Sequence, residues 1–232
     1  MSSRLHRRLD WRSIASRHPS AFLLAAQLGS LHLYASVEGN PGGRALLSAV
    51  GVLILSLVLW VLRRSPTIGW MTTLFAIPAF ILSTLSIFFV SVNLLIWTST
   101  LEAILYFYAA GSLILYMLED TRVTTDELFA AGATFTLLAW AFAFVFLACE
   151  LSSPNSFKRG DDQSQPWTFL QFLYMSFNNL SSTGLGDIVP IGPHARVFVM
   201  FEQFCGVAYI AVVVSRLIGM TIRDRGKDDA TG

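Results

Sequence analysis

Stretches of about 20 apolar residues recur along this chain, and each is long enough to cross the hydrocarbon core of a bilayer. Hydrophobic residues make up 54% of the sequence and charged residues only 13%, a composition beyond that of an ordinary soluble domain. We therefore expect an all-α integral membrane protein with six transmembrane helices. The candidate spans are residues 21–36, 45–62, 68–90, 94–118, 128–149 and 196–219.

The sequence leaves two alternatives for the turn between the third and fourth spans and two for the nature of the first span. The apolar run from Ile68 to Leu118 is too long for one span, so a turn is expected at Ser91-Val92-Asn93 or at Thr98-Ser99-Thr100. The first span is short and follows a basic segment, which is also the pattern of a cleaved signal peptide. Either reading of the first span leaves the topology of the others unchanged.

Basic residues favour one orientation in the membrane. They cluster before the first span, after the second and after the last, at Arg4, Arg7, Arg8, Arg12, Arg17, Arg63, Arg64, Arg223, Arg225 and Lys227. The positive-inside rule then predicts a multi-pass protein of the cell membrane with both termini in the cytoplasm. The net charge of +1 and the lack of a basic cluster elsewhere argue against nucleic acid as a partner.

A segment too short to span follows the fifth candidate span. Leu151 to Gln165 is polar and rich in turn formers, and we expect an exposed loop there. Pro166 suits the first position of a helix, and a helix from there to about Leu180 would be roughly 22 Å long. Because this length cannot cross a bilayer, the segment is expected to enter the membrane and return.

The string Ser182-Thr183-Gly184-Leu185-Gly186-Asp187 follows this short helix. Non-helical backbone at membrane depth is tolerated only where it is buried in protein or lines water. Glycines at alternate positions adopt backbone angles that a Cβ disfavours, which allows successive carbonyl groups to face one way and replace the water around a cation. The partly negative C-terminal end of the preceding helix also favours a cation. The string is therefore a candidate ion filter.

These residues resemble the pore of the potassium channel family, whose filter reads Thr-Val-Gly-Tyr-Gly followed by Asp. The resemblance runs from about Leu128 to Met220. It includes an outer-mouth turn at Asp187-Ile188-Val189-Pro190, an arginine at Arg196 where the last helix opens, and Gly206 at the spacing of the family's inner-helix hinge.

The resemblance implies a homotetramer, because one chain offers one filter loop. It implies potassium as the permeant ion, with no cofactor, bound by Ser182, Thr183, Gly184, Leu185 and Gly186. Tyr174 and Asn178 are expected to hydrogen-bond Asp187 and so support the filter. Leu185 replaces the usual aromatic and Ser182 the usual threonine, so a non-selective or sodium-permeable cation channel is the alternative.

The first four spans lack the features of a voltage sensor. Residues 94–118 contain no Lys or Arg, whereas a sensor needs several charges in the field, so conventional voltage gating is not expected. Glu102 and Glu202 are possible regulatory carboxyl groups, and Arg216 is expected to reach the cytoplasmic headgroups. The tail is too short for a ligand-sensing domain, so a regulator would be lipid, voltage acting through the filter, pH or a separate subunit.

The predicted domains are a basic cytoplasmic N-terminus (1–20), a four-helix peripheral membrane domain (21–118), a cytoplasmic linker (119–127), a pore domain (128–220) and a short cytoplasmic tail (221–232). No HExxH motif, paired catalytic carboxylates or Cys/His metal spacing occurs in the spans, so an enzyme is not expected. A membrane sensor subunit without conduction is the remaining alternative, in which the glycine loop is only a tight turn.

Overall fold

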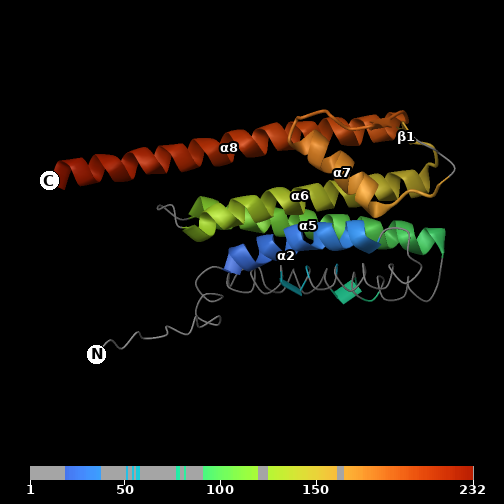
Figure 1. The fold of residues 1–232 in the computed structure, drawn as a ribbon, viewed down its shortest axis with the longest axis horizontal. Coiled ribbons are helices and arrows are strands. Elements are labelled where there is room, and N and C mark those ends of the chain that lie inside the picture. The colour runs from blue at the N-terminus through green and yellow to red at the C-terminus, as the bar shows by residue number, and fades with distance from the viewer. Residues whose placement is uncertain are drawn as a thin grey trace, which may run out of the picture.

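The computed structural model of the chain describes residues 19–37, 91–119, 125–160 and 165–231, with isolated positions at 51, 54, 56, 57, 77, 78 and 81. Its long helices run alongside one another in Figure 1, and they are α2 (Pro19–Val37), α5 (Val92–Glu119), α6 (Thr125–Ser152) and α8 (Pro193–Thr231). The short helix α7 (Phe169–Leu180) lies between α6 and α8 near one end of the molecule. Strands β1 (Phe157–Arg159) and β2 (Ile188–Pro190) pair at that end.

Three helices of the described part are long and apolar enough to cross a membrane, namely Val92–Leu118, Thr125–Ser152 and Pro193–Arg216. They correspond to the fourth, fifth and sixth predicted spans. Helix α2 covers the first predicted span, although it is not one of these three. The second and third predicted spans lie largely outside the described residues.

The start of α5 decides between the two predicted turns. The helix begins at Val92, within the first of the two predicted turns, and Thr98-Ser99-Thr100 lies inside the helix, which excludes a turn there. The hydroxyls of Thr98 and Thr100 each donate to a carbonyl four residues earlier, at 2.8 Å. This local bond lets hydroxyl residues sit inside an apolar helix.

Helix α7 begins three residues later than predicted. Its N-cap is Thr168, whose hydroxyl accepts from the backbone N–H of Gln171 (3.3 Å), while the Gln171 side chain accepts from the backbone N–H of Thr168 (3.1 Å). This capping box satisfies two backbone donors at once. Pro166 consequently lies before the helix and does not open it.

The segment before α7 is not the wholly exposed loop predicted from the sequence. Residues 157–159 form β1, in which Phe157 and Arg159 are buried, and the strand pairs antiparallel with β2. Arg159 lies opposite Ile188 and Phe157 opposite Pro190. The fold is thus mostly helical with a two-stranded sheet, and this sheet joins the chain entering the short helix to the chain leaving the candidate filter.

Trp140 lies where four helices meet. It is fully buried in α6, and its ring is 5.5 Å from that of Tyr34 in α2, 5.7 Å from that of Tyr106 in α5 and 5.6 Å from that of Phe169 in α7. Aromatic pairs at such separations contribute beyond the area that they bury. The start of the short helix is therefore packed against the peripheral helices as well as against α6.

Polar side chains fix the register of α2 on α6. Gln27 is fully buried, accepts a hydrogen bond from the Thr136 hydroxyl (2.7 Å) and donates to the Ala133 carbonyl (3.5 Å). Nearer the start of both helices, Ser20 donates to Asp126 from its backbone and its hydroxyl. Because these contacts advance together along both helices, α2 and α6 run parallel.

Glu150 holds the turn that follows α6. Its carboxylate accepts from the backbone N–H groups of Asn155 (2.8 Å), Ser156 (2.9 Å) and Phe157 (3.2 Å). The Ser156 carbonyl in turn accepts from the backbone of Ile191 and Gly192 after β2, both at 2.9 Å. One carboxylate thus organises the loop on which β1 and β2 are built.

We expect Glu150→Gln to lower the free energy of unfolding of the purified protein by about 1.5–3 kcal/mol, the typical contribution of a hydrogen bond to a charged group, because the amide provides only one acceptor oxygen. Thermal unfolding in detergent measures the change. Ser152→Ala is the matched control, since this exposed hydroxyl bonds only within α6. Equal melting of the Glu150 variant and the wild type would show that the carboxylate does not hold this turn.

Candidate functional site

The chain leaves α7 by turning around the Asn178 carbonyl. This oxygen accepts from the backbone N–H of Thr183 (3.1 Å) and of Gly184 (3.4 Å), while Ser182 donates to the Asn179 carbonyl (3.0 Å). The Thr183 hydroxyl lies 3.3 Å from the backbone oxygen and 3.2 Å from the side-chain oxygen of Asn178 and can donate its one hydrogen to either. The first half of the candidate filter is therefore held by the end of its own helix.

Left-handed backbone occurs at alternate residues of the filter string. Ser182 has φ 58° and Gly184 has φ 66°, whereas Gly186 is not in this region. The sequence predicted that Gly184 and Gly186 would carry the special angles. In the structure the two left-handed residues are Gly184 and Ser182. Because the Cβ of a serine disfavours this region, the backbone at Ser182 is strained.

Tyr174 and Asn178 do not contact Asp187 as predicted. The Tyr174 hydroxyl donates to the Leu185 carbonyl (3.4 Å), and the Asn178 amide donates to the Tyr174 carbonyl of its own helix (2.8 Å). Asp187 is exposed. Because Asn178 already bonds Tyr174 and Thr183, its amide is engaged within the loop and not with the outer carboxylate.

Gly206 is a point of close helix packing. A Cβ placed on it would lie 2.0 Å from the carbonyl oxygen of Leu180 and 2.8 Å from the carbonyl carbon. Leu180 is the last residue of α7, and α8 continues unbroken through Gly206. The sequence assigned a hinge to this glycine. In the structure its missing side chain lets the long helix touch the end of the short one.

The two carboxyl groups singled out in the sequence lie in different surroundings. Glu202 is fully buried, and the Ser176 hydroxyl of α7 is hydrogen-bonded to it. Glu102 is partly buried in the first half of α5, near Tyr34 and Tyr106. Glu202 therefore belongs to the wall behind the short helix, whereas Glu102 faces the peripheral helices.

Arg159 is a structural residue of the site that the sequence did not single out. It is 3% exposed, donates to the Gln171 side chain (3.1 Å) and the Gln165 carbonyl, and lies 4.8 Å from the centre of the Trp167 ring. These contacts fix the start of α7. Its basic charge within a polar loop gave no signal of burial, which arises from the pairing of β1 with β2.

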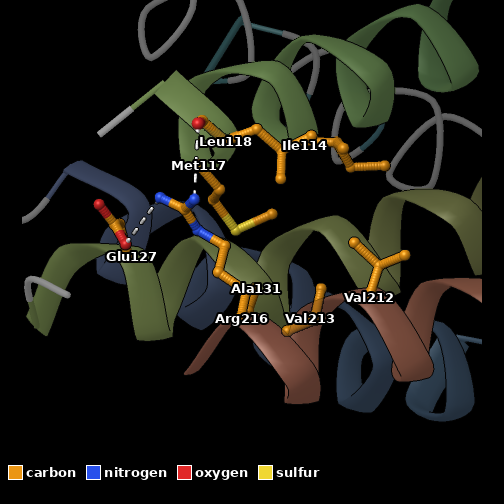
Figure 2. A pocket seen from close by; sticks show the side chains of 8 residues that line it. All are labelled: Ile114, Met117, Leu118, Glu127, Ala131, Val212, Val213 and Arg216. Carbon is orange, nitrogen blue, oxygen red and sulfur yellow. Dashed lines mark hydrogen bonds and ion pairs between the residues drawn. The ribbon is translucent and has the colours of Figure 1, made fainter. Parts of the chain in front are cut away.

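Arg216 reaches inward, although the sequence predicted that it would reach the headgroups. Figure 2 shows its guanidinium between Glu127 of α6 and the Leu118 carbonyl at the end of α5. The ion pair with Glu127 spans 3.9 Å and the hydrogen bond to Leu118 is 3.4 Å. The small cavity there is otherwise lined by apolar side chains. The two oxygens therefore offset part of the cost of removing the guanidinium from water.

The filter string itself is uncovered in the single chain. Ser182, Thr183 and Gly184 are exposed, and Leu185 is 81% exposed. No group of three or more His, Cys, Asp or Glu residues in the described part could hold a metal ion. From Ser182 to Gly186 the string offers backbone carbonyl oxygens and the hydroxyls of Ser182 and Thr183, and its carboxylate is that of Asp187 at the end.

Comparisons with known proteins agree with this reading of the segment. Residues 132–223 match the family model described as "Ion channel". The inward rectifier potassium channel Kirbac3.1 of Paramagnetospirillum magnetotacticum is 32% identical over 76 residues, which cover 32% of this chain and 22% of that protein. The chain thus aligns with about a fifth of the length of that relative. No solved structure matches the chain.

The similarity predicted from the filter residues is confirmed at this level. The residues that match the ion-channel model contain α7, the candidate filter and Gly206, and the chain is similar over 76 residues to a potassium channel. The long apolar helices are those of a membrane protein.

We expect Gly206→Ala to destabilise the protein by about 1–3 kcal/mol or more, as overpacking does in a well-packed interior, because the new methyl group meets backbone that has no free end to move. Gly219→Ala in the same helix is the matched control, since nothing lies within 4 Å of its Cβ position, and it should be neutral or stabilising. Thermal unfolding of both variants measures the difference. Similar melting temperatures would contradict the close contact with Leu180.

Proposed function

We propose that the chain is a subunit of a potassium-selective ion channel that conducts passively through a filter of Ser182, Thr183, Gly184, Leu185 and Gly186. The observation that carries this proposal is the course of the chain between α7 and β2. A short capped helix ends at Leu180, the string follows with left-handed residues at alternate positions, and β2 pairs back to β1. The match of residues 132–223 to the ion-channel model and the similarity of the chain to a potassium channel support it.

Potassium is proposed because the string offers neutral oxygen ligands. Carbonyl groups replace the hydration shell of a cation without a fixed negative charge that would hold the ion too tightly. The Leu185 carbonyl keeps a second lone pair for an ion while it accepts from Tyr174. The hydroxyl of Ser182 supplies a further oxygen at the inner end, and the end of α7 adds the partial negative charge of its last carbonyls.

A homotetramer is proposed because one chain supplies one filter loop. The exposed apolar face of α8 supports this assembly, since only 22% of its most apolar stretch is buried in the single chain, against 72% for α6. The exposed side chains include Met200, Phe201, Phe204, Val207 and Ile210. Other copies and lipid would cover this face in a multi-pass protein with six spans and cytoplasmic termini.

The filter support is proposed to differ from that of a channel with an aromatic residue between the glycines. Leu185 has no hydroxyl, and Tyr174 of the short helix donates instead to the Leu185 backbone. Asn178 holds Thr183, and Asp187 faces the outer mouth. Because this bond is long and the Leu185 side chain is exposed, a non-selective cation channel is the second candidate. A membrane sensor subunit without conduction is a weaker third.

Recordings from purified protein in planar bilayers test the proposal. With potassium on one side and sodium on the other, the reversal potential should follow the potassium gradient. A reversal potential near zero would favour the non-selective channel, and no current at all would favour the sensor.

Two glycine variants make this test specific to the filter. Gly184→Ala places a Cβ on a left-handed residue, which costs roughly 1–2 kcal/mol, and we expect it to abolish the current. Gly186→Ala meets no atom closer than 3.9 Å and has an ordinary φ, so we expect a smaller loss. Currents of wild-type size through Gly184→Ala would refute the filter assignment.

Channel opening should depend only weakly on voltage, because α5 contains no Lys or Arg. A sensor moves several charges per subunit, each worth about 2.3 kcal/mol per 100 mV, whereas we expect an effective valence of about one or less. Conductance measured over a range of voltages gives this value. A steep curve that persists in filter variants would show that another segment carries the sensor.

A further inference from the structure

A buried carboxyl group joins the long helix to the short one. Glu202 of α8 and Ser176 of α7 are both fully buried, and Glu202 Oε1 is hydrogen-bonded to Ser176 Oγ. The same Ser176 Oγ is 2.8 Å from the carbonyl oxygen of Ala139 in α6. Three helices therefore meet at one hydroxyl group.

Counting protons at this hydroxyl decides which group donates. A serine has a single O–H hydrogen, and the Ala139 carbonyl has none, so both contacts are hydrogen bonds only when Ser176 uses its hydrogen on Ala139. The contact between Ser176 and Glu202 then needs a hydrogen from the glutamate. Two oxygen atoms within hydrogen-bond distance repel each other when no hydrogen lies between them.

The surroundings of Glu202 favour the neutral acid as well. No Lys, Arg or His of the described part forms an ion pair with it, and its second oxygen, Oε2, has no hydrogen-bond partner there. The Asn179 side chain is near the Glu202 carboxyl group, but its amide nitrogen Nδ2 has no hydrogen-bond partner among the described residues. A charge buried among such partners is costly, whereas a neutral acid is tolerated.

The groups that face Glu202 carry no compensating charge. From α7 they are Ser176 and Asn179, and from α6 the Ala139 carbonyl. The titratable neighbour on its own helix is Cys205, which is a free thiol. Nothing among these groups would stabilise a carboxylate as an ion pair does.

We propose that Glu202 is a positioning residue held as the neutral acid, which donates to Ser176 while Ser176 donates to Ala139, and that this chain of bonds sets the depth of α7 against α8. Glu202 and Ser176 are 26 residues apart, and Gly206 and Leu180 lie one turn further along the same two helices. The bond and the close backbone contact therefore act on successive turns, directly before the filter string.

Infrared spectroscopy tests the protonation directly and does not rest on the proposed function. The wild type at neutral pH should show a C=O stretching band of a protonated carboxyl group that disappears in Glu202→Gln. Glu150→Gln is the control and should leave that band in place, because Glu150 accepts three backbone N–H bonds as a carboxylate. A wild type without the band would overturn the proposal.

Conduction tests the positioning role, and this part rests on the proposed function. Glu202→Gln keeps a donor for Ser176 and should keep the wild-type ratio of potassium to sodium permeability. Glu202→Leu and Ser176→Ala break the chain and should each lower this ratio by roughly fivefold, the equivalent of one hydrogen bond. A Glu202→Gln channel that behaves like Glu202→Leu would overturn the role.

The double variant Ser176→Ala with Glu202→Leu should lose no more than either single variant, because both remove one shared chain of bonds. Additive losses would show two independent contacts and count against the proposal. If Glu202→Leu does not fold, Ser176→Ala and the infrared band still decide. If the wild type conducts nothing, the proposed function fails while the infrared result stands.

Discussion

In the proposed channel the string between α7 and β2 is non-helical backbone at membrane depth, and such backbone has to find its hydrogen-bond partners within the protein. The Asn178 carbonyl accepts from Thr183 and Gly184, which folds the filter string back on the end of α7. After the string, β2 pairs with β1, and Glu150 accepts from three backbone N–H groups between α6 and β1. The string is therefore held at both ends, by hydrogen bonds to the end of α7 and by the pairing of β2 with β1.

The position of α7 depends on contacts with every neighbouring element. Its start is held by Arg159 and packed on Trp140 through Phe169. Its middle is bonded through Ser176 and its end lies against Gly206. These contacts come from β1, α6 and α8, and the ring of Tyr34 in α2 also lies 5.5 Å from that of Phe169. A movement of α2 and a movement of α8 can therefore both reach the short helix.

Apolar runs made the long helices predictable from sequence. The bounds of α5 and α6 and the start of α8 lie within three residues of the predicted spans, whereas α8 continues to Thr231, 12 residues beyond the predicted end at residue 219. The filter string and the short helix were found for a similar reason, since glycine spacing and helix length are local signals. The start of α7 was missed because the Thr168 and Gln171 capping box was overlooked. The partners of Tyr174, Arg159 and Gly206 could not be read at all, because each contact depends on how distant segments pack.

The contact at Gly206 divides α8 into two unequal arms. About 20 Å of helix lies between Pro193 and this glycine, and about 37 Å between the glycine and Thr231, at the α-helical rise. If the contact with Leu180 acts as a fulcrum, any tilt of the helix displaces its far end nearly twice as far as the end beside β2. Arg216 lies about 15 Å along the longer arm at the α-helical rise, and its contacts with Glu127 and Leu118 (Figure 2) tie that arm to α6 and α5.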